Sequence, residues 1–339
     1  FDGARLTINS NGAMAWKSTG TVTIQDLVLE GTVSHWFGGL TGRLFGNITV
    51  PTGALGRFEA AQTENDQRLF AIYSPISGSG NIQVTMGHTN ALKQTSLLAN
   101  NSGFTGRVIL RGLGKFGICA EEGLGTPPAA FTANQMELSG MTLIFTNSLT
   151  LNDPTRGILL NNTLNASGQI YPGGAVEVTG VNTATVACVV SGSGPFAKRG
   201  TGTLLVATNF TYTGATSVQA GMLRLAPQGS LASPAVTVTG STAVVAGEGA
   251  LGAVTLTAGG RIAAEKGGWD IGSLTVLNTT NVTFELDLSG ADPDTALIRI
   301  SGAMTKLPFQ VFQFTVNTNG TTETPYKVLT ASNLAAFKD

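Results

Sequence analysis

Two histidines, His35 and His88, supply the only imidazoles of this 339-residue chain. In a Ser-His-Asp triad, one of them would have to lie beside an activated serine. Ser77 and Ser191 lie in Ser-Gly-Ser-Gly segments, and neither has the strand-to-helix setting of a nucleophile elbow. We therefore expect both histidines to be surface or loop residues with no catalytic role.

Paired carboxylates could act as acid and base on a polysaccharide if they lay about 5–10 Å apart. Glu121 and Glu122 are one such pair, and Glu59, Glu64 and Asp66 form a looser group. Adjacent residues of a strand point to opposite faces, so the pair could share a cleft only within a loop. Neighbouring glycines and prolines favour a loop there, and we expect its acids to be solvated.

Metal and cofactor chemistry has few candidates. Asp292 and Asp294 flank a proline and could offer carboxylates to calcium, but they lack the alternating spacing of a calcium-binding loop. The glycine-rich segment Gly112–Lys115 precedes no helix that could present its N-terminus to a phosphate. The sequence therefore predicts no metal site and no cofactor, and an ordinary acidic turn at Asp292–Asp294.

The segment His35-Trp36-Phe37 is an aromatic cluster followed by two glycines. Such a cluster could stack on a sugar or on a protein partner, which makes these three residues candidate contact residues. Alternatively, the cluster covers the hydrophobic core near the N-terminal end of the fold. The sequence leaves both interpretations open.

The composition of the chain excludes several classes of protein. The chain has 45 glycines, 12 % charged residues, 42 % hydrophobic residues and a net charge of −1. A disordered chain has fewer apolar residues and more net charge, and a nucleic-acid binder needs a basic stripe. No apolar run approaches the roughly 20 residues that span a bilayer. We expect a folded chain without a membrane span and without a nucleic-acid partner.

Alternation of apolar and polar residues predicts β-strands along most of the chain. Four segments show it most clearly: Thr21–Leu29, Asn81–Met86, Ala235–Thr239 and Asn281–Leu288. Threonine and valine dominate these runs, and β-branched side chains suit a pleated surface. The fold class is therefore all-β.

Helical segments are expected only at Glu59–Leu69 and Asn333–Lys338. Internal repetition distinguishes a solenoid from a sandwich or a barrel. The Ser-Gly-Ser-Gly element at residues 76–80 returns at residues 190–194, and an aromatic-Thr-Gly element follows each copy. This repetition favours a β-solenoid.

The segment Val190–Leu225 closely resembles the autotransporter-associated β-strand repeat of bacterial autotransporter-like surface proteins. The resemblance rests on Gly200–Leu204, Tyr212–Gly214 and Ala220–Leu223. A weaker copy covers residues 76–116, and residues 294–334 look like the closing part of such a passenger region.

The resemblance implies a right-handed parallel β-helix with about 20–22 residues in each coil. It divides the chain into N-terminal coils or a capping region at 1–75, a repeat-bearing solenoid at 76–290 and closing coils at 291–339. It also implies an extracellular location at a bacterial cell surface.

Coil length has consequences for the two cysteines. Cys119 and Cys188 lie 69 residues apart, which is about three coils, whereas a disulfide needs Cα atoms within about 7 Å. We expect two reduced, buried cysteines. Lys198 and Arg199 are expected to face solvent between two strands.

Together these features predict a non-enzymatic, extracellular structural or adhesive β-solenoid of a bacterial surface protein. Self-association through solenoid ends or edges into a fibre or surface assembly is expected, because unpaired strand edges favour pairing with another chain. Surface glycans or a host receptor are further candidate partners. The alternative is a polysaccharide-binding or polysaccharide-cleaving β-helix, based on His35–Phe37 and on the loop at Glu121.

Overall fold

The chain forms two compact units, residues 1–176 and 177–339, with the boundary inside β19 (Gly174–Val178). In the described residues the only helical element is the 3-10 turn η1 (Glu121–Leu124), and none of them forms a helix long and apolar enough to cross a membrane. The computed structural model describes residues 5–16, 20–35, 41–60, 68–86, 93–165, 167–265, 268–277, 282–289, 291, 294–307, 312–317 and 328–333.

The first unit consists of strands connected by short corners and loops. These strands are β1 (Arg5–Ile8), β2 (Ala13–Trp16), β3 (Gly20–Leu29), β4 (Thr32–His35), β5 (Thr41–Thr49), β6 (Leu55–Ala60), β7 (Arg68–Ile72), β8 (Ile76–Ser77), β9 (Asn81–Met86), β10 (Lys93–Leu97), β11 (Val108–Gly112), β12 (Lys115–Ile118), β13 (Thr132–Ser139), β14 (Thr142–Phe145), β15 (Leu149–Leu151), β16 (Arg156–Leu160), β17 (Asn162–Leu164) and β18 (Ile170–Pro172).

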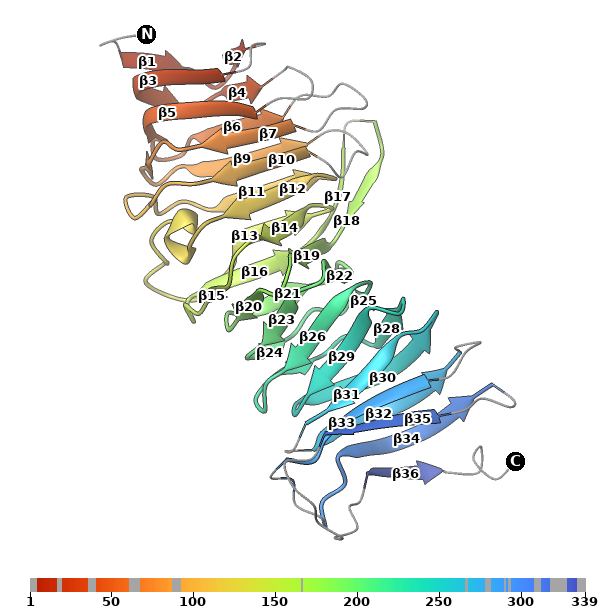
Figure 1. The fold of residues 1–339 in the computed structure, drawn as a ribbon. Helices are drawn as coiled ribbons and strands as arrows, with labels where there is room; N and C mark the ends of the chain where they lie inside the picture. Colours follow the sequence, from red (N-terminus) through yellow and green to blue (C-terminus); the bar gives the residue numbers. More distant parts are fainter. Residues whose placement is uncertain are drawn as a thin grey trace. The chain divides into compact units, whose positions relative to one another are not determined.

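Two parallel sheets run through this unit, and the chain alternates between them. One sheet contains β1, β3, β5, β7, β10, β12 and β14, each paired with the next. The other contains β2, β4, β6, β9, β11, β13 and β16 in the same manner. Figure 1 shows these strands stacked in chain order, and the antiparallel hairpin β17–β18 extending from the stack. The unit is therefore a parallel β-helix.

Aliphatic side chains fill the interior because every second residue of each strand points inward. Register stacks these residues from coil to coil, so that each column is continuous and buried. Two such columns on the second sheet are Ile82–Val108–Met136–Ile158 and Val84–Leu110–Leu138–Leu160, all buried.

Glycines make two of the sharp corners in this unit. Gly112 and Gly140 have φ values of 121° and 78°, a conformation that other residues rarely adopt. A Cβ added at Gly140 would lie 2.4 Å from the carbonyl oxygen of Gly112 on the preceding coil. The tight stacking of these corners therefore requires glycine.

The second unit repeats the design with strands of similar length. These strands are β20 (Thr183–Val186), β21 (Val190–Gly192), β22 (Phe196–Arg199), β23 (Thr203–Val206), β24 (Asn209–Phe210), β25 (Thr216–Val218), β26 (Gly221–Leu225), β27 (Ser230–Leu231), β28 (Ala235–Thr239), β29 (Ala243–Gly247), β30 (Ala250–Thr257), β31 (Arg261–Ala264), β32 (Trp269–Val276), β33 (Val282–Asp287), β34 (Ile298–Lys306), β35 (Phe312–Asn317) and β36 (Leu329–Asn333).

One sheet of this unit contains β20, β23, β26, β29, β31, β33 and β35, paired in that order and all parallel. We call it the β20–β35 sheet. A second parallel sheet contains β22, β25, β28, β30, β32, β34 and β36. Partners in the earlier coils lie close to the expected spacing: Ala184 pairs with Leu204, and Leu204 with Leu223.

The structure confirms the all-β parallel helix and the four strands expected from alternation, which are β3, β9, β28 and β33. The helix expected at Glu59–Leu69 was wrong at both ends, because Glu59 lies in β6 and Leu69 in β7. Both ends pair with strands of neighbouring coils, and this pairing outweighs helical propensity. Asn333 belongs to β36, and the rest of the second expected helix lies outside the described residues. The expected division at 75/76 and 290/291 remains a prediction.

Candidate functional site

His35 is the last residue of β4 and is fully buried. Its ring centroid lies 5.6 Å from that of Trp16 and 6.3 Å from that of Phe70. The surface or loop position expected for His35 was therefore wrong. Val33 and His35 share the inward phase of β4, and this alternation is the signal that could have placed the ring inside.

His35 is thus part of an aromatic cluster in the core. This position corresponds to the second interpretation of the sequence, in which the cluster covers the hydrophobic core. The T-shaped contact of Trp16 with Phe70, at 5.3 Å, extends this cluster. Trp36, Phe37 and His88 lie outside the described residues. A contact role for Trp36 and Phe37 remains a prediction.

Glu121 begins the η1 turn and contacts a loop on the next coil. Its carboxylate accepts hydrogen bonds from the backbone N–H groups of Asn152 (3.0 Å) and Asp153 (3.3 Å). It also lies 3.7 Å from Nε of Arg156, whose side chain is buried. The solvated position expected for Glu121 was thus wrong, whereas Glu122 is exposed as expected. The two carboxylates do not form a common site.

Arg156 continues this arrangement into the interior. Its guanidinium donates hydrogen bonds to the carbonyl oxygens of Leu124 (3.2 Å) and Gly125 (2.8 Å). A guanidinium carries five donors and needs such partners when it is buried. Glu121 and Arg156 therefore hold the η1 turn against the following coil.

The remaining sequence candidates are dispersed. Glu59 lies on the outward side of β6 and contacts the hydroxyl of Ser34 at 3.5 Å. Glu64, Asp66 and Asp292 lie outside the described residues. Within the described part of the chain, no group of three or more histidine, cysteine or acidic side chains is arranged to hold a metal ion.

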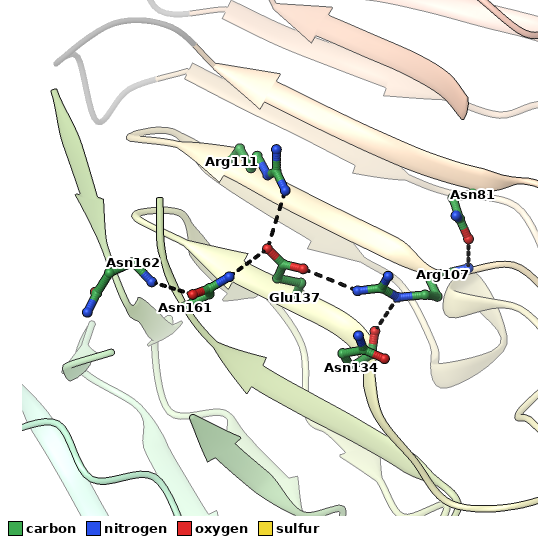
Figure 2. A network of polar contacts seen from close by, with 7 residues as sticks. All are labelled: Asn81, Arg107, Arg111, Asn134, Glu137, Asn161 and Asn162. Carbon is green, nitrogen blue, oxygen red and sulfur yellow. Dashed lines mark hydrogen bonds and ion pairs between the residues drawn. The ribbon is translucent and has the colours of Figure 1, made fainter. Parts of the chain in front are cut away.

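Glu137 is the centre of a polar network that the sequence did not reveal (Figure 2). Its buried carboxylate lies 3.2 Å from Nη2 of Arg107 and 3.5 Å from Nη2 of Arg111. Nδ2 of Asn161 donates a further hydrogen bond of 3.1 Å. The network joins β11, β13 and the residue after β16.

Strand register places these groups. Glu137 pairs with Ile109 of β11, and Arg107 and Arg111 lie two residues before and after Ile109, Arg107 just before β11 and Arg111 within it. Arg107 also donates to the carbonyl oxygen of Asn134 at 2.7 Å, and its backbone N–H donates to Asn81. Since both carboxylate oxygens of Glu137 accept hydrogen bonds from charged donors, the group ties neighbouring coils together.

Lys198 lies in the interior of the second unit, in the column that continues through Val218 and Val238. Its ammonium donates to the carbonyl oxygens of Arg199 (2.7 Å), Gly200 (2.8 Å) and Ala220 (3.1 Å). Burial lowers the pKa of Lys198 to about 8, and the charge of Glu177 partly opposes this shift. The solvent-facing position expected for Lys198 was therefore wrong.

Ion pairs connect coils on the outer surface of the second unit. Arg224 makes a bidentate pair with Glu265, with Nε–Oε1 and Nη2–Oε2 distances of 2.6 and 2.5 Å. Arg261 pairs with Glu285 on the same sheet. On the other sheet, Arg299 makes a bidentate pair with Asp270.

A hollow of about 500 Å³ lies beside the first two pairs. Its polar lining comes from Arg224, Glu265, Glu285, Asp287 and Thr315 of the β20–β35 sheet and the residue after β31. Sequence reasoning missed this site because its members lie in four different coils, and the number of residues per coil varies.

Cys119 and Cys188 form no disulfide with each other. Cys188 is buried, as expected. Cys119 is exposed, so its expected burial was wrong: it follows β12 at a corner instead of occupying an inward strand position.

Compared with known proteins, the chain matches no protein-family model, no curated protein and no solved structure at a significant level.

Proposed function

We propose that this chain is a non-enzymatic structural or adhesive β-solenoid of an extracellular bacterial surface protein. The observation that carries the proposal is that polar side chains of this chain bind groups on other coils. Glu121 binds backbone N–H groups of another coil, Glu137 binds two arginines, and Lys198 binds three carbonyls. Groups suited to acid–base chemistry serve here to connect coils.

The proposed location at the cell surface is supported by features of this sequence and not by a match to a known protein. The segment Val190–Leu225, which resembles the autotransporter-associated repeat, forms β21 to β26, and its Phe210 and Tyr212 rings are buried. Only 12 % of the residues are charged. Such a composition suits stacked coils that do not depend on ion pairs for solubility.

Self-association is part of the proposal and has its own support. The hairpin β17–β18 places Leu164 and Ile170 opposite each other, with 68 % and 58 % of these residues exposed. On β35, Phe314 and Val316 are half-exposed. Exposed apolar side chains on strands favour pairing with another chain.

An activity assay tests the non-enzymatic part. The purified chain is incubated with neutral and acidic polysaccharides, and new reducing ends and unsaturated products are measured. We expect no cleavage above a buffer control. Turnover that is lost in Glu121→Gln or Glu122→Gln would support the cleaving alternative and contradict the proposal.

Polysaccharide binding without cleavage is the second candidate function. It is favoured by the hollow beside Arg224 and Glu265, where donors and acceptors of hydrogen bonds lie side by side. An adhesive surface protein needs such a contact site, so this candidate is compatible with the structural role.

A further inference from the structure

The geometry points to the hollow on the outer face of the β20–β35 sheet as a binding site for a neutral sugar unit of a polysaccharide, held through adjacent hydroxyl groups. This inference rests on the adhesive part of the proposed function. It concerns residues that the aromatic cluster at His35 does not include.

Side-chain size creates the hollow. The outward column of the sheet runs Arg224, Ala246, Ala263, Glu285 and Thr315 on successive strands. Ala263, a small residue on the strand before Glu285, leaves space above the backbone and lines the hollow. Ala263 provides apolar lining from the outward column, and the polar side chains surround it.

Arg224 spans this column rather than pointing into solvent. It lies 41 residues before its partner Glu265 and reaches past the β29 coil to bind it. Ala246 is completely buried although its position faces outward, as expected if the arginine covers it. The hydrogen bond with Glu265 raises the pKa of Arg224, so the guanidinium stays charged.

Hydrogen-bonding capacity remains after these pairs form. Arg224 uses Nε and Nη2 on Glu265, and no bond from its Nη1 to another described residue is found. A carboxylate accepts about four hydrogen bonds, so Glu265 and Glu285 retain acceptor positions. An arginine donor beside a carboxylate acceptor matches two neighbouring hydroxyls of a sugar ring, each of which donates and accepts.

Charge selects the class of sugar. Glu265, Glu285 and Asp287 contribute three acids around the hollow, against Arg224 and the Arg261 that pairs with Glu285. Glu248 adds a further negative charge that acts on Arg224, and the surplus of negative charge disfavours uronate or sulfated sugars. The apolar C–H face of a neutral sugar fits the apolar lining at Ala263.

The volume is also appropriate. About 500 Å³ lies within the range of about 300–1,000 Å³ that is typical of small-molecule sites. The bidentate pair Arg299–Asp270 has the same chemistry on the other sheet, but neither residue lines this hollow. That pair therefore supplies a matched control.

Immobilised polysaccharides test the inference with the full chain. Dextran, laminarin and galactomannan are the neutral probes, and polygalacturonate is the acidic probe; binding is followed by biolayer interferometry. Glu265→Gln replaces one carboxylate oxygen by a donor, and Ala263→Ile fills the hollow without replacing a residue of an ion pair. Asp270→Asn and Thr255→Ile are the controls at outward positions of the other sheet.

We expect at least one neutral polysaccharide to bind more tightly than polygalacturonate. Both hollow variants should weaken that binding by about tenfold or more, as for loss of a hydrogen bond to a charged group, and both controls should leave it unchanged. Ala263→Ile keeps the test decisive if Glu265→Gln lowers stability.

Failure to bind any neutral probe, tighter binding of polygalacturonate, or unchanged binding by the hollow variants would overturn the inference. Sedimentation of the same variants without sugar measures self-association separately. A negative result in the sugar-binding assay alone would therefore overturn this inference without overturning the proposed structural role.

Discussion

The ammonium of Lys198 donates a hydrogen bond to the carbonyl oxygen of Ala220, 3.1 Å away and 22 residues further along the chain. The same ammonium binds two carbonyls at its own corner, so one buried cation joins two successive coils. An inward strand position that would normally hold valine thus holds a polar connection between coils.

Replacement of this lysine should destabilise the fold. Lys198→Met keeps the length and apolar stem of the side chain but leaves three carbonyl groups without their donor. We expect the free energy of unfolding at pH 7 to fall by about 1–3 kcal/mol. Urea unfolding measures the change. Arg199→Met, at the neighbouring half-buried position, is the control and should cost less than about 0.5 kcal/mol; equal losses in both variants would contradict the role given to Lys198.

The stability contributed by Lys198 should depend on pH in a defined direction. Burial lowers its pKa from 10.5 to about 8, so between these values the unfolded chain binds more protons than the folded chain. Stability rises with pH wherever the unfolded state binds more protons. The difference in unfolding free energy between wild type and Lys198→Met should therefore grow from pH 8 to pH 10.5, by up to about 3 kcal/mol. A difference that stays constant over this range would refute the shifted pKa.

The two acids at η1 should behave differently. Glu121→Ala removes the acceptor of two backbone N–H groups and the partner of buried Arg156, so we expect a loss of about 1–3 kcal/mol. Glu122→Ala alters an exposed side chain and should change stability by less than about 0.5 kcal/mol. Thermal unfolding of both variants checks this, and a larger loss in Glu122→Ala would argue against the arrangement.

Gly42 should not tolerate alanine. A Cβ there would lie 2.4 Å from Cδ2 of His35, inside the aromatic cluster. We expect Gly42→Ala to destabilise by about 1–3 kcal/mol, the usual cost of overfilling a core. Gly123→Ala is the control, because its nearest contact would be an ordinary 3.4 Å to Ile118. Calorimetry that finds equal effects in both variants would contradict the packing described for His35.

Alternation in the sequence was enough to predict four strands and the all-β class, whereas the parallel β-helix was predicted from internal repetition and from the resemblance to the autotransporter-associated repeat. At two positions, alternation also indicates the direction of the side chain more reliably than residue type does. His35 is in phase with Val33, and Lys198 is in phase with Phe196, so the pattern places both inward. Their polarity suggested the surface, but aromatic neighbours and carbonyl groups make burial acceptable.

Contacts between coils could not be predicted in the same way. The number of residues from one coil to the next varies: Val245 pairs with Ile262, 17 residues on, whereas Phe284 pairs with Phe314, 30 residues on. Local sequence therefore does not say which outward side chains meet. For this reason the Glu137 network and the Arg224–Glu265 pair became visible only with the register.

The central claim, a structural solenoid that assembles with copies of itself, is tested most directly by sedimentation. The full chain is centrifuged over a wide range of concentrations, and the same samples are imaged by negative-stain electron microscopy. The proposal predicts a mass that rises reversibly with concentration and ordered assemblies in the images. A single monomer mass at every concentration, with only separate monomers in the images, would contradict it.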